Sequence, residues 1–273
     1  MSARTIVITG ASDGIGAAAA RSLSAAGDRV VVVGRSPDKT AAVAREIGAD
    51  AFVADFARLD DVRRLASELL AACPRIDVLA NNAGGIMGAR EETVDGHEKT
   101  FQVNHLGPFL LTTLLMDRLL DGGARVLNTS SAANRAFSRF EIDDLDARKD
   151  YSPNRAYGNA KLANILFTTE LNRRHGLQGI DTAAFHPGGV ATGFATGSTS
   201  PMRFVYQTVL RRFLLSAEQG ADTLVWLATA SPGVDWVPGG YYAKRAIAKV
   251  NPQARDADLA RELWERSARM VDA

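Results

Sequence analysis

Short apolar or β-branched runs alternate with amphipathic stretches along almost the whole chain, and this alternation limits the possible folds more than any other feature. The run Val30–Val33 is continuously apolar, as expected of a parallel strand that is covered by helices on both faces. The pattern predicts strands at Thr5–Thr9, Arg29–Val33, Ala51–Ala54, Asp77–Ala80, Arg125–Thr129, Asp181–Phe185 and Gly240–Ala243. It predicts helices near 15–26, 37–47, 59–72, 93–120, 156–175, 218–230 and 256–270. Ser216 and Gln219 have the spacing of a capping box at the start of the sixth helix.

Strands that alternate with helices predict a doubly wound, Rossmann-type α/β fold. Such a fold has one parallel sheet, here of about seven strands, with helices on both faces and ligands at the carboxyl ends of the strands. No Pro/Gly/Ser-rich linker and no internal repeat divides the 273 residues, so we expect a single domain over 1–273. Two long connections stand out, and long loops in compact domains are usually functional or mobile. We interpret 132–155 as an insertion and 188–215, with Phe194, Phe204, Tyr206 and Phe213, as a substrate lid that is mobile without ligand.

Charge and cysteine usage narrow the class of protein. The formal net charge is +1 with both signs scattered, so a nucleic acid is not an expected partner. Cys73 is the only cysteine, which excludes an internal disulfide and predicts a free, buried thiol, and no Cys/His cluster predicts a metal site. The chain enters a predicted strand by Arg4, and no apolar stretch approaches the ~20 residues that span a bilayer. We therefore expect a cytoplasmic protein that does not use a membrane.

The first predicted strand leads into a glycine-rich turn, Thr9–Gly16, that opens the first predicted helix. Glycines in such a turn let backbone N–H groups and the positive end of the helix approach a pyrophosphate. Glycines are also common in ordinary strand–helix turns, but the position directly after an apolar strand favours dinucleotide binding. The spacing here is G-x3-G-x-G, which differs from the common G-x-G-x-x-G.

The end of the second predicted strand bears on the choice of cofactor. An acidic residue there would bind the ribose hydroxyls of NAD, whereas a nearby arginine accommodates the 2′-phosphate of NADP. The position holds Gly34 followed by Arg35, which predicts NADP, with Lys39 one turn further along as a second cation. A solvated surface arginine is the alternative, and Asp13 near the phosphates argues against the preference.

Tyr157 and Lys161 lie four residues apart within a predicted helix and therefore on one face of it. A free phenol titrates near ~10 and is a poor base at neutral pH. An adjacent ammonium and an oxidised nicotinamide both favour the phenolate, which brings the tyrosine into working range. Because Y-x3-K also occurs by chance, surface packing is the alternative for this pair taken alone.

Seven marks occur in a fixed order along the chain: Thr9–Gly16, Asp55, Asn81–Gly84, Asn104, Ser130–Ser131, Tyr157 with Lys161, and His186–Gly188. In this respect the sequence resembles the short-chain dehydrogenase/reductase family over essentially its whole length. Three runs, Asn104–Thr112, Tyr157–Phe167 and Leu263–Ser267, look most like the subgroup of retinol dehydrogenases, the WW-domain oxidoreductase and protochlorophyllide reductases. The long segment 132–155 also resembles that subgroup.

The resemblance implies a role for each matching residue. Tyr157 would be the acid and base, and Lys161 would lower its pKa and hold the nicotinamide ribose. Ser131, the second of the Ser130–Ser131 pair, would donate to the substrate oxygen, and Asn104 would hold a water that links Lys161 to solvent. Cofactor contacts are implied for Gly10, Ser12, Asp13, Gly14, Ile15, Gly16, Arg35, Asp55, Phe56, Asn82, Ala83, Gly84, Tyr157, Lys161, Pro187, Gly188, Val190 and Thr192.

Residues and resemblance together predict an NADP(H)-dependent oxidoreductase that reduces a carbonyl on a small apolar or aromatic substrate, or oxidises the corresponding alcohol. One alternative is NADPH-dependent reduction of a conjugated C=C bond. An alternative of another class is a nucleotide-binding regulatory protein without turnover, although such a protein could have lost Tyr157, Lys161 or Ser131 and this chain keeps all three. In the family, helices matching 95–120 and 156–175 form dimer faces, which implies a homodimer or homotetramer.

Overall fold

The computed structural model describes residues 3–189 and 215–272, and one eight-stranded sheet runs through this part of the chain. Its strands are β1 (Thr5–Thr9), β2 (Arg29–Gly34), β3 (Asp50–Val53), β4 (Val78–Asn81), β5 (Arg125–Thr129), β6 (Asp181–His186), β7 (Gly240–Ala243) and β8 (Ala246–Ile247). They are ordered β3-β2-β1-β4-β5-β6-β7-β8, with parallel neighbours except for the antiparallel pair β7 and β8. The predicted doubly wound α/β sheet is confirmed. The two-residue strand β8 was not predicted, because so short a strand has no readable alternation.

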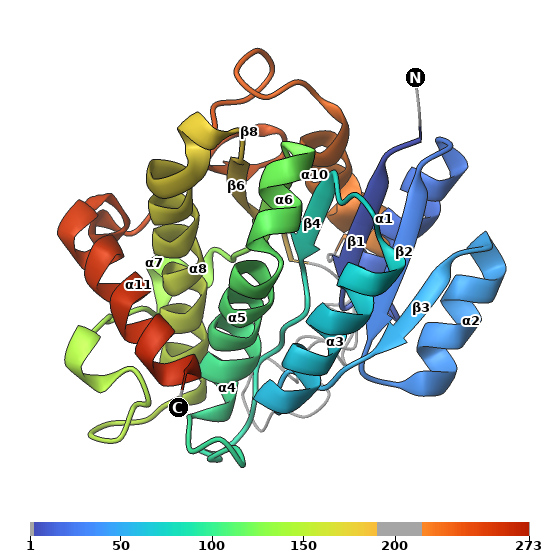
Figure 1. The fold of residues 1–273 in the computed structure, drawn as a ribbon. Helices are drawn as coiled ribbons and strands as arrows, with labels where there is room; N and C mark the ends of the chain where they lie inside the picture. Colours follow the sequence, from blue (N-terminus) through green and yellow to red (C-terminus); the bar gives the residue numbers. More distant parts are fainter. Residues whose placement is uncertain (1–2, 190–214, 273) are drawn as a thin grey trace.

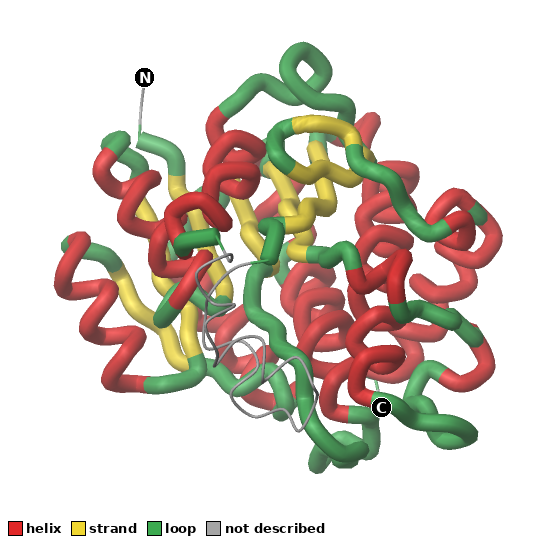
Figure 2. Tube along the Cα trace, turned by 180° about the vertical axis from the view of Figure 1, so that it is seen from behind, coloured by secondary structure: helices red, strands yellow, loops and turns green. Residues whose placement is uncertain are grey.

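Helices cover both faces of the sheet. They are α1 (Gly14–Ala25), α2 (Pro37–Ile47), α3 (Leu59–Ala72), α4 (Lys99–Phe101), α5 (Gly107–Leu114), α6 (Met116–Gly122), α7 (Ala133–Ala136), α8 (Pro153–His175), α10 (Ala217–Thr229) and α11 (Ala257–Val271). Figure 1 shows α3, α5 and α8 against one face with α11 outside α8, and Figure 2 shows the molecule from the opposite side. The capping box of Ser216 and Gln219 at the start of α10 is confirmed.

Alternate residues of the strands supply the two halves of the core. Val7 and Val31 belong to the cluster that includes α3, α5, α8 and α11, whereas Ile6 and Val32 belong to the cluster that includes α1, α2 and α10. All four side chains are fully buried, with 0% of their surface exposed. Burial on both faces explains why these strands are continuously apolar, and it leaves the carboxyl edge of the sheet as the place for polar chemistry.

The helix predicted near 93–120 begins later and is interrupted. The carboxylate of Glu98 accepts hydrogen bonds from the backbone N–H groups of Thr100 (2.9 Å) and Phe101 (2.8 Å), which caps the helix at that point. A π-helical turn, Gln102–Leu106, then separates α4 from α5, and α6 is a further separate helix. The apolar periodicity was interpreted correctly, but the prediction of one continuous helix was wrong. Acidic caps compete with helix continuation, and periodicity does not show this.

The segment 132–155 is more ordered than a plain loop. It contains α7 and a 3-10 turn at Ile142–Asp144, and α8 begins within it at Pro153, earlier than the predicted start at residue 156. The hydroxyl of Ser152 caps α8 by accepting from the backbone N–H of Arg155 (3.3 Å). Proline in the first turn and serine at the cap are the usual start signals of a helix. Further 3-10 turns lie at Gly176–Gln178 and Pro252–Arg255.

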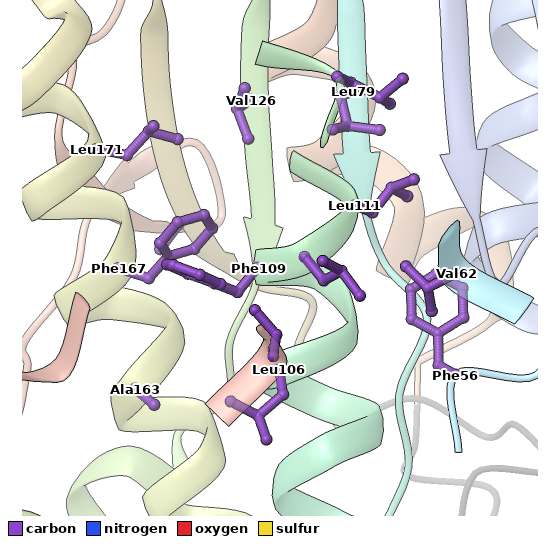
Figure 3. Packing of buried hydrophobic residues seen from close by; sticks show 14 of the residues in the cluster. Phe56, Val62, Leu79, Leu106, Phe109, Leu111, Val126, Ala163, Phe167 and Leu171 are labelled. Atoms are coloured by element: carbon purple, nitrogen blue, oxygen red, sulfur yellow. The ribbon is translucent and has the colours of Figure 1, made fainter. Parts of the chain in front are cut away.

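The last helix, α11, packs across α5 and α8. The ring of Trp264 lies 5.1 Å from that of Phe109 on α5 and 5.6 Å from that of Phe167 on α8, measured between centroids. The guanidinium of Arg174 lies 4.7 Å above the indole, a cation–π contact. Figure 3 shows Phe109 and Phe167 against each other between the two helices. The C-terminal helix thus covers part of the surface that α5 and α8 would otherwise present.

The predicted free and buried Cys73 is confirmed. Most of the predicted lid, with its four aromatic residues, lies outside the described residues, which end at 189 and resume at 215. Among the helices that the structure describes, none is long and apolar enough to cross a bilayer.

The packing of α11 predicts the cost of removing its central leucine. Leu263 is 1% exposed, so Leu263→Ala should lower the free energy of unfolding by about 2–5 kcal/mol, because it leaves a cavity between α11 and α8. Leu177 is fully exposed, and Leu177→Ala should change stability by no more than about 0.5 kcal/mol. Urea unfolding of both variants measures the difference. If both variants lost the same free energy of unfolding, the buried side chain of Leu263 would not be what holds α11 in place.

Candidate active site

A cavity of about 950 Å³ lies at the carboxyl edge of the sheet, within the usual range for small-molecule sites. It is lined by the turn after β1, the ends of β2 and β3, the loops after β4, β5 and β6, and the first turns of α8. The predicted site residues among its lining are Gly10, Ser12, Asp13, Gly14, Ile15, Gly16, Arg35, Asp55, Phe56, Asn82, Ala83, Gly84, Ser131, Tyr157, Lys161, Pro187 and Gly188. Val190 and Thr192 lie outside the described residues.

The glycine-rich turn touches its neighbours so closely that two positions have no room for a side chain. Gly10 has φ +66°, and a Cβ there would lie 2.8 Å from the Cα of Ala83. A Cβ at Gly16 would lie 2.3 Å from the carbonyl oxygen of Gly10. The turn therefore brings bare backbone to the start of α1, as a turn that binds phosphate groups requires.

Asn82 fastens the loop after β4 to this turn. Its Nδ2 donates to the carbonyl oxygens of Thr9 (3.0 Å) and Gly10 (3.3 Å). The backbone N–H groups of Asn82 and Ala83 both donate to the Thr9 hydroxyl at 3.0 Å. The amide of Asn82 thus holds the geometry of the glycine-rich turn, in addition to lining the cavity.

The end of β2 excludes an acidic side chain by packing alone. A Cβ on Gly34 would lie 2.4 Å from the hydroxyl oxygen of Thr40 and 2.7 Å from the Cβ of Ser12. A carboxylate at this position would have to displace both residues. The absence of a carboxylate at position 34 therefore has a steric cause as well as an electrostatic consequence.

The charges beside Gly34 are arranged differently from the simple expectation. Arg35 is exposed and lines the cavity. Lys39, expected as a second cation for the cofactor, instead donates to Asp13 at 2.9 Å. This hydrogen bond lowers the pKa of Asp13, whose other carboxylate oxygen caps α1 by accepting from the N–H of Gly14 at 2.8 Å. Lys39 therefore offsets the charge of Asp13, whereas Arg35 forms no ion pair with any residue of 3–189 or 215–272.

The two adjacent serines after β5 differ in their surroundings. Ser130 is 1% exposed, and its hydroxyl donates to the carbonyl oxygen of Lys161 at 2.7 Å. Ser131 is partly exposed, and its hydroxyl oxygen accepts a hydrogen bond from the N–H of Ala133 at 3.2 Å. That acceptor role leaves the Ser131 proton available to a ligand, whereas the Ser130 proton is used inside the protein. The geometry favours Ser131, as the resemblance implied.

Tyr157 and Lys161 lie on one face of α8, as predicted from their spacing. They are 6% and 1% exposed, and the Nζ of Lys161 lies 5.5 Å from the centre of the Tyr157 ring. Lys161 donates to the carbonyl oxygen of Thr129 at 3.1 Å. Desolvation lowers the pKa of Lys161 to about 7, so its proton can leave or return near neutral pH.

Asn104 is close to this pair but does not line the cavity. It is 0% exposed within the π-helical turn, and its Nδ2 donates to the carbonyl oxygens of Gly85 (2.9 Å) and Thr100 (2.8 Å). A Cβ on Gly84 would lie 2.4 Å from the Asn104 Oδ1 and 3.1 Å from the Lys161 Nζ. Glycine at 84 thus lets the loop after β4 lie directly against both groups.

Several residues that line the cavity were not predicted as site residues, and four of them bear on its chemistry. Ile86 and Ala133 form an apolar cluster with Tyr157, and Phe137 lines the cavity with 42% of its surface exposed. His186 also lines it; its Nδ1 accepts from the N–H of Gly188 at 3.3 Å, and burial lowers its pKa. All four residues lie at the end of a strand or in the connection that follows one, so this position was the only signal that the sequence offered. Within the described residues, no group of three or more His, Cys, Asp or Glu could hold a metal ion.

Comparison with known proteins identifies the family. The sequence profile described as short chain dehydrogenase matches residues 4–202. A protein of Streptomyces sp. (strain C5), provisionally named daunorubicin C-13 ketoreductase DnrU, is 45% identical over 98% of this chain and 92% of its own. The chain belongs to the short-chain dehydrogenase family.

Two further relatives agree with this assignment. Human retinol dehydrogenase 11 is 36% identical over 98% of this chain and 86% of its own. A crystal structure of an uncharacterised protein from Mycobacterium paratuberculosis superimposes with a TM-score of 0.78 at 34% identity, covering 99% and 94% of the two chains. As a short-chain dehydrogenase, the protein is an oxidoreductase that uses an NAD(P) nucleotide.

The buried ammonium of Lys161 predicts a pH-dependent stability that does not require turnover. Its pKa is about 7 in the folded protein and 10.5 in the unfolded chain, so between these values the unfolded state binds more protons. The free energy of unfolding should therefore rise with pH in this window, by up to about 1.4 kcal/mol per pH unit. Lys161→Met should lack this contribution. Denaturant unfolding of both cofactor-free proteins from pH 6 to 10 measures it, and parallel pH profiles would contradict it.

Proposed function

We propose that this short-chain dehydrogenase reduces a ketone or aldehyde to an alcohol with NADPH, or oxidises the alcohol with NADP⁺. One observation carries the proposal: a single cavity is lined both by the glycine turn at α1 and by Tyr157, Lys161 and Ser131. A dinucleotide bound along this cavity would have its phosphates at the turn and its nicotinamide near the tyrosine. A regulatory protein without turnover would need only the first half of this arrangement.

The residues of the cavity fit a dinucleotide. The turn lacks side chains where the backbone must approach phosphate groups, and the adjoining wall is polar. Arg35 would contact the 2′-phosphate, Asp55 the adenine, and Lys161 the nicotinamide ribose. The remaining contacts are proposed for Gly10, Ser12, Asp13, Gly14, Ile15, Gly16, Phe56, Asn82, Ala83, Gly84, Tyr157, Pro187 and Gly188, together with Val190 and Thr192 from outside the described residues.

The chain's own residues supply the acid–base part of the reaction. The cofactor, when bound, gives or accepts the hydride. In reduction, the Tyr157 hydroxyl gives its proton to the carbonyl oxygen as the oxygen becomes negative, while the Ser131 hydroxyl donates a hydrogen bond to the same atom. The Lys161 ammonium favours the phenolate that remains on Tyr157. Because its pKa is about 7, Lys161 can pass a proton back to the tyrosine side near neutral pH.

We propose that the substrate is apolar or aromatic where it meets the protein. Ile86 and Ala133 pack with Tyr157, and Phe137 lines the same cavity, so the wall beside the proposed acid is apolar. The relative that is 45% identical is named as a ketoreductase, which supports a ketone as the substrate. The relative named as a retinol dehydrogenase supports the same interconversion of an alcohol and a carbonyl. Ketone reduction is therefore preferred over reduction of a C=C bond.

Three further properties remain proposals. We propose that residues 1–273 act as one domain, because one sheet organises all the described elements. We propose a cytoplasmic location, in keeping with the free, buried Cys73. A homodimer or homotetramer was expected through the faces of helices near 95–120 and 156–175. Since Trp264 of α11 packs on both of these helices, an oligomer formed through the faces that α11 covers would include α11 in its interface.

Removing the proposed proton donor tests the function. With NADPH and the aryl ketone 2-acetylnaphthalene, Tyr157→Phe should lower kcat by about 10²–10⁴-fold, because the ring stays in place and only the transferable proton is lost. NADPH should still bind. Tyr242→Phe is the matched control, since among the described residues the hydroxyl of the buried Tyr242 bonds only to Val237. Normal turnover in Tyr157→Phe would remove Tyr157 from the mechanism.

Arg35 and Asp13 test the cofactor preference in opposite directions. Arg35→Ala should weaken NADPH binding by about 1.5–3 kcal/mol and leave NADH unchanged, because only NADPH carries the 2′-phosphate. Asp13→Asn keeps an acceptor for the cap of α1 but releases Lys39, so it should tighten NADPH. Fluorescence titration with both cofactors, at low and high salt, measures these affinities. High salt should reduce the difference between the affinities for NADPH and NADH. Equal wild-type affinities, or equal losses for both cofactors, would reject NADP while leaving hydride transfer standing.

A further inference from the structure

We propose that Asn164, His105 and Ser267 are positioning residues that connect the C-terminal helix α11 to Lys161 through a buried chain of hydrogen bonds. The inference rests on the proposed function, since it concerns how the proposed Tyr157–Lys161 pair is held. The three residues are 3%, 0% and 0% exposed. They do not line the cavity, so they would act only through the groups that they hold.

The end of this hydrogen-bond chain nearest to Lys161 is the amide of Asn164. Its Nδ2 donates to the backbone carbonyl oxygens of Asn104 and Thr129, each at 3.0 Å. The Thr129 carbonyl also accepts from the Nζ of Lys161 at 3.1 Å. Asn164 and Lys161 therefore share one acceptor, and the position of that acceptor decides where the ammonium lies beside Tyr157.

The orientation of the Asn164 amide follows from its partners. A backbone carbonyl can only accept hydrogen bonds, so the atom facing the two carbonyls must be the nitrogen. The Oδ1 then faces the Nδ1 of His105 at 3.3 Å. Because Oδ1 can only accept, Nδ1 must carry a proton.

The same reasoning fixes the state of His105. Burial lowers the pKa of His105 to about 4, so the ring is neutral at physiological pH and carries one proton. That proton is on Nδ1, which leaves Nε2 as an acceptor. The Ser267 hydroxyl lies 2.8 Å from Nε2 and must donate to it. The chain of bonds thus has one direction, from Ser267 through His105 and Asn164 to the carbonyls beside Lys161.

The His105 ring is held on its other sides by aromatic residues. The rings of Phe101, Phe109 and Phe167 lie 5.0, 6.2 and 6.1 Å away between centroids. His105 belongs to the π-helical turn Gln102–Leu106, and such turns are rare and frequently lie at functional sites. Figure 3 shows Phe109 and Phe167 meeting between α5 and α8, where α11 adds Trp264. This packing leaves the His105 ring little room to move away from Asn164.

The chain of hydrogen bonds also joins three sequence segments through residues to which the proposed chemistry gives no role. His105 lies in Asn104–Thr112, Asn164 in Tyr157–Phe167, and Ser267 at the end of Leu263–Ser267. These segments are far apart in sequence, and the structure joins them at these three side chains. Helix α11 thereby contributes to the site without reaching the cavity.

The first test reads the ring directly and does not depend on turnover. Nitrogen-15 NMR of histidine-labelled wild-type protein should show His105 neutral and protonated on Nδ1 from pH 5.5 to 8, as the hydrogen bonds require. In Ser267→Ala, the Nε2 resonance should move because its donor is lost. A ring protonated on Nε2, or a cationic ring, would overturn the proposal even if no carbonyl substrate were turned over.

The second test reads the pH profile with NADPH and 2-acetylnaphthalene. Asn164→Leu removes both donors at similar volume and should lower kcat by about tenfold to a hundredfold, with KM values within about twofold, because the reacting groups are misplaced rather than lost. The alkaline decline of the rate should also move to a pH lower by about half a unit or more, since Asn164 no longer fixes the Thr129 carbonyl that accepts from the Lys161 ammonium. Ser267→Ala should give a smaller change of the same kind.

Thr112→Val is the control, because it deletes a buried hydroxyl that accepts from Asn81 at 3.0 Å but does not contact the chain. Its pH profile should match that of the wild type. Identical profiles for Ser267→Ala, Asn164→Leu and Thr112→Val at similar losses of thermal stability would show a merely structural role. If wild type does not reduce the ketone, the proposed function fails, and the NMR measurement alone decides the hydrogen-bond chain.

Discussion

The burial of Lys161 is the constraint around which the carboxyl edge of the sheet is arranged. A lysine that is 1% exposed loses nearly all of its hydration, and the pKa of about 7 expresses that cost. The side chain is accepted because the Thr129 carbonyl meets its ammonium and because Gly84 leaves space beside it. A group that is costly to bury and sits at the end of parallel strands is a strong pointer to chemistry.

The two ends of the cavity are shaped in different ways, one by missing side chains and the other by hydrogen-bonded ones. At the end beside α1, Gly10, Gly16 and Gly34 occupy places where a side chain would collide with its neighbours. At the end beside α8, Ser130 and Ser131 both line the cavity, but the Ser130 hydroxyl donates to the Lys161 carbonyl whereas the Ser131 hydroxyl accepts from the N–H of Ala133. The joining of both ends in one cavity is what turns a nucleotide-binding fold into a candidate for hydride transfer.

Features that depend on neighbours in sequence were predicted well. The apolar strands, the glycine turn and the i, i+4 relation of Tyr157 and Lys161 all follow from local pattern, and the structure has each of them. The helix predicted near 93–120 was wrong in extent because the carboxylate of Glu98 caps it. A cap is a competition between side chain and backbone, and apolar periodicity does not reveal its outcome.

Contacts between distant segments could not be predicted from local pattern. Nothing near Lys39 shows that it pairs with Asp13, and nothing near Ser267 shows that it faces His105. The resemblance to a family supplied candidate roles for individual residues, but the direction of each hydrogen bond required the positions of both partners. The same limit applies to the apolar wall at Ile86 and Ala133, which is assembled from two loops.

Transfer of a labelled hydride tests the central claim most directly. NADPH carrying deuterium at the transferable position of the nicotinamide would be incubated with an enone, 4-phenyl-3-buten-2-one, which offers both a C=O and a C=C bond to the same cavity. Carbonyl reduction at Tyr157 predicts an allylic alcohol with one deuterium on the carbinol carbon for wild type, and none above background for Tyr157→Phe. A saturated ketone with deuterium on the carbon β to an intact carbonyl, or equal labelling in both proteins, would contradict it.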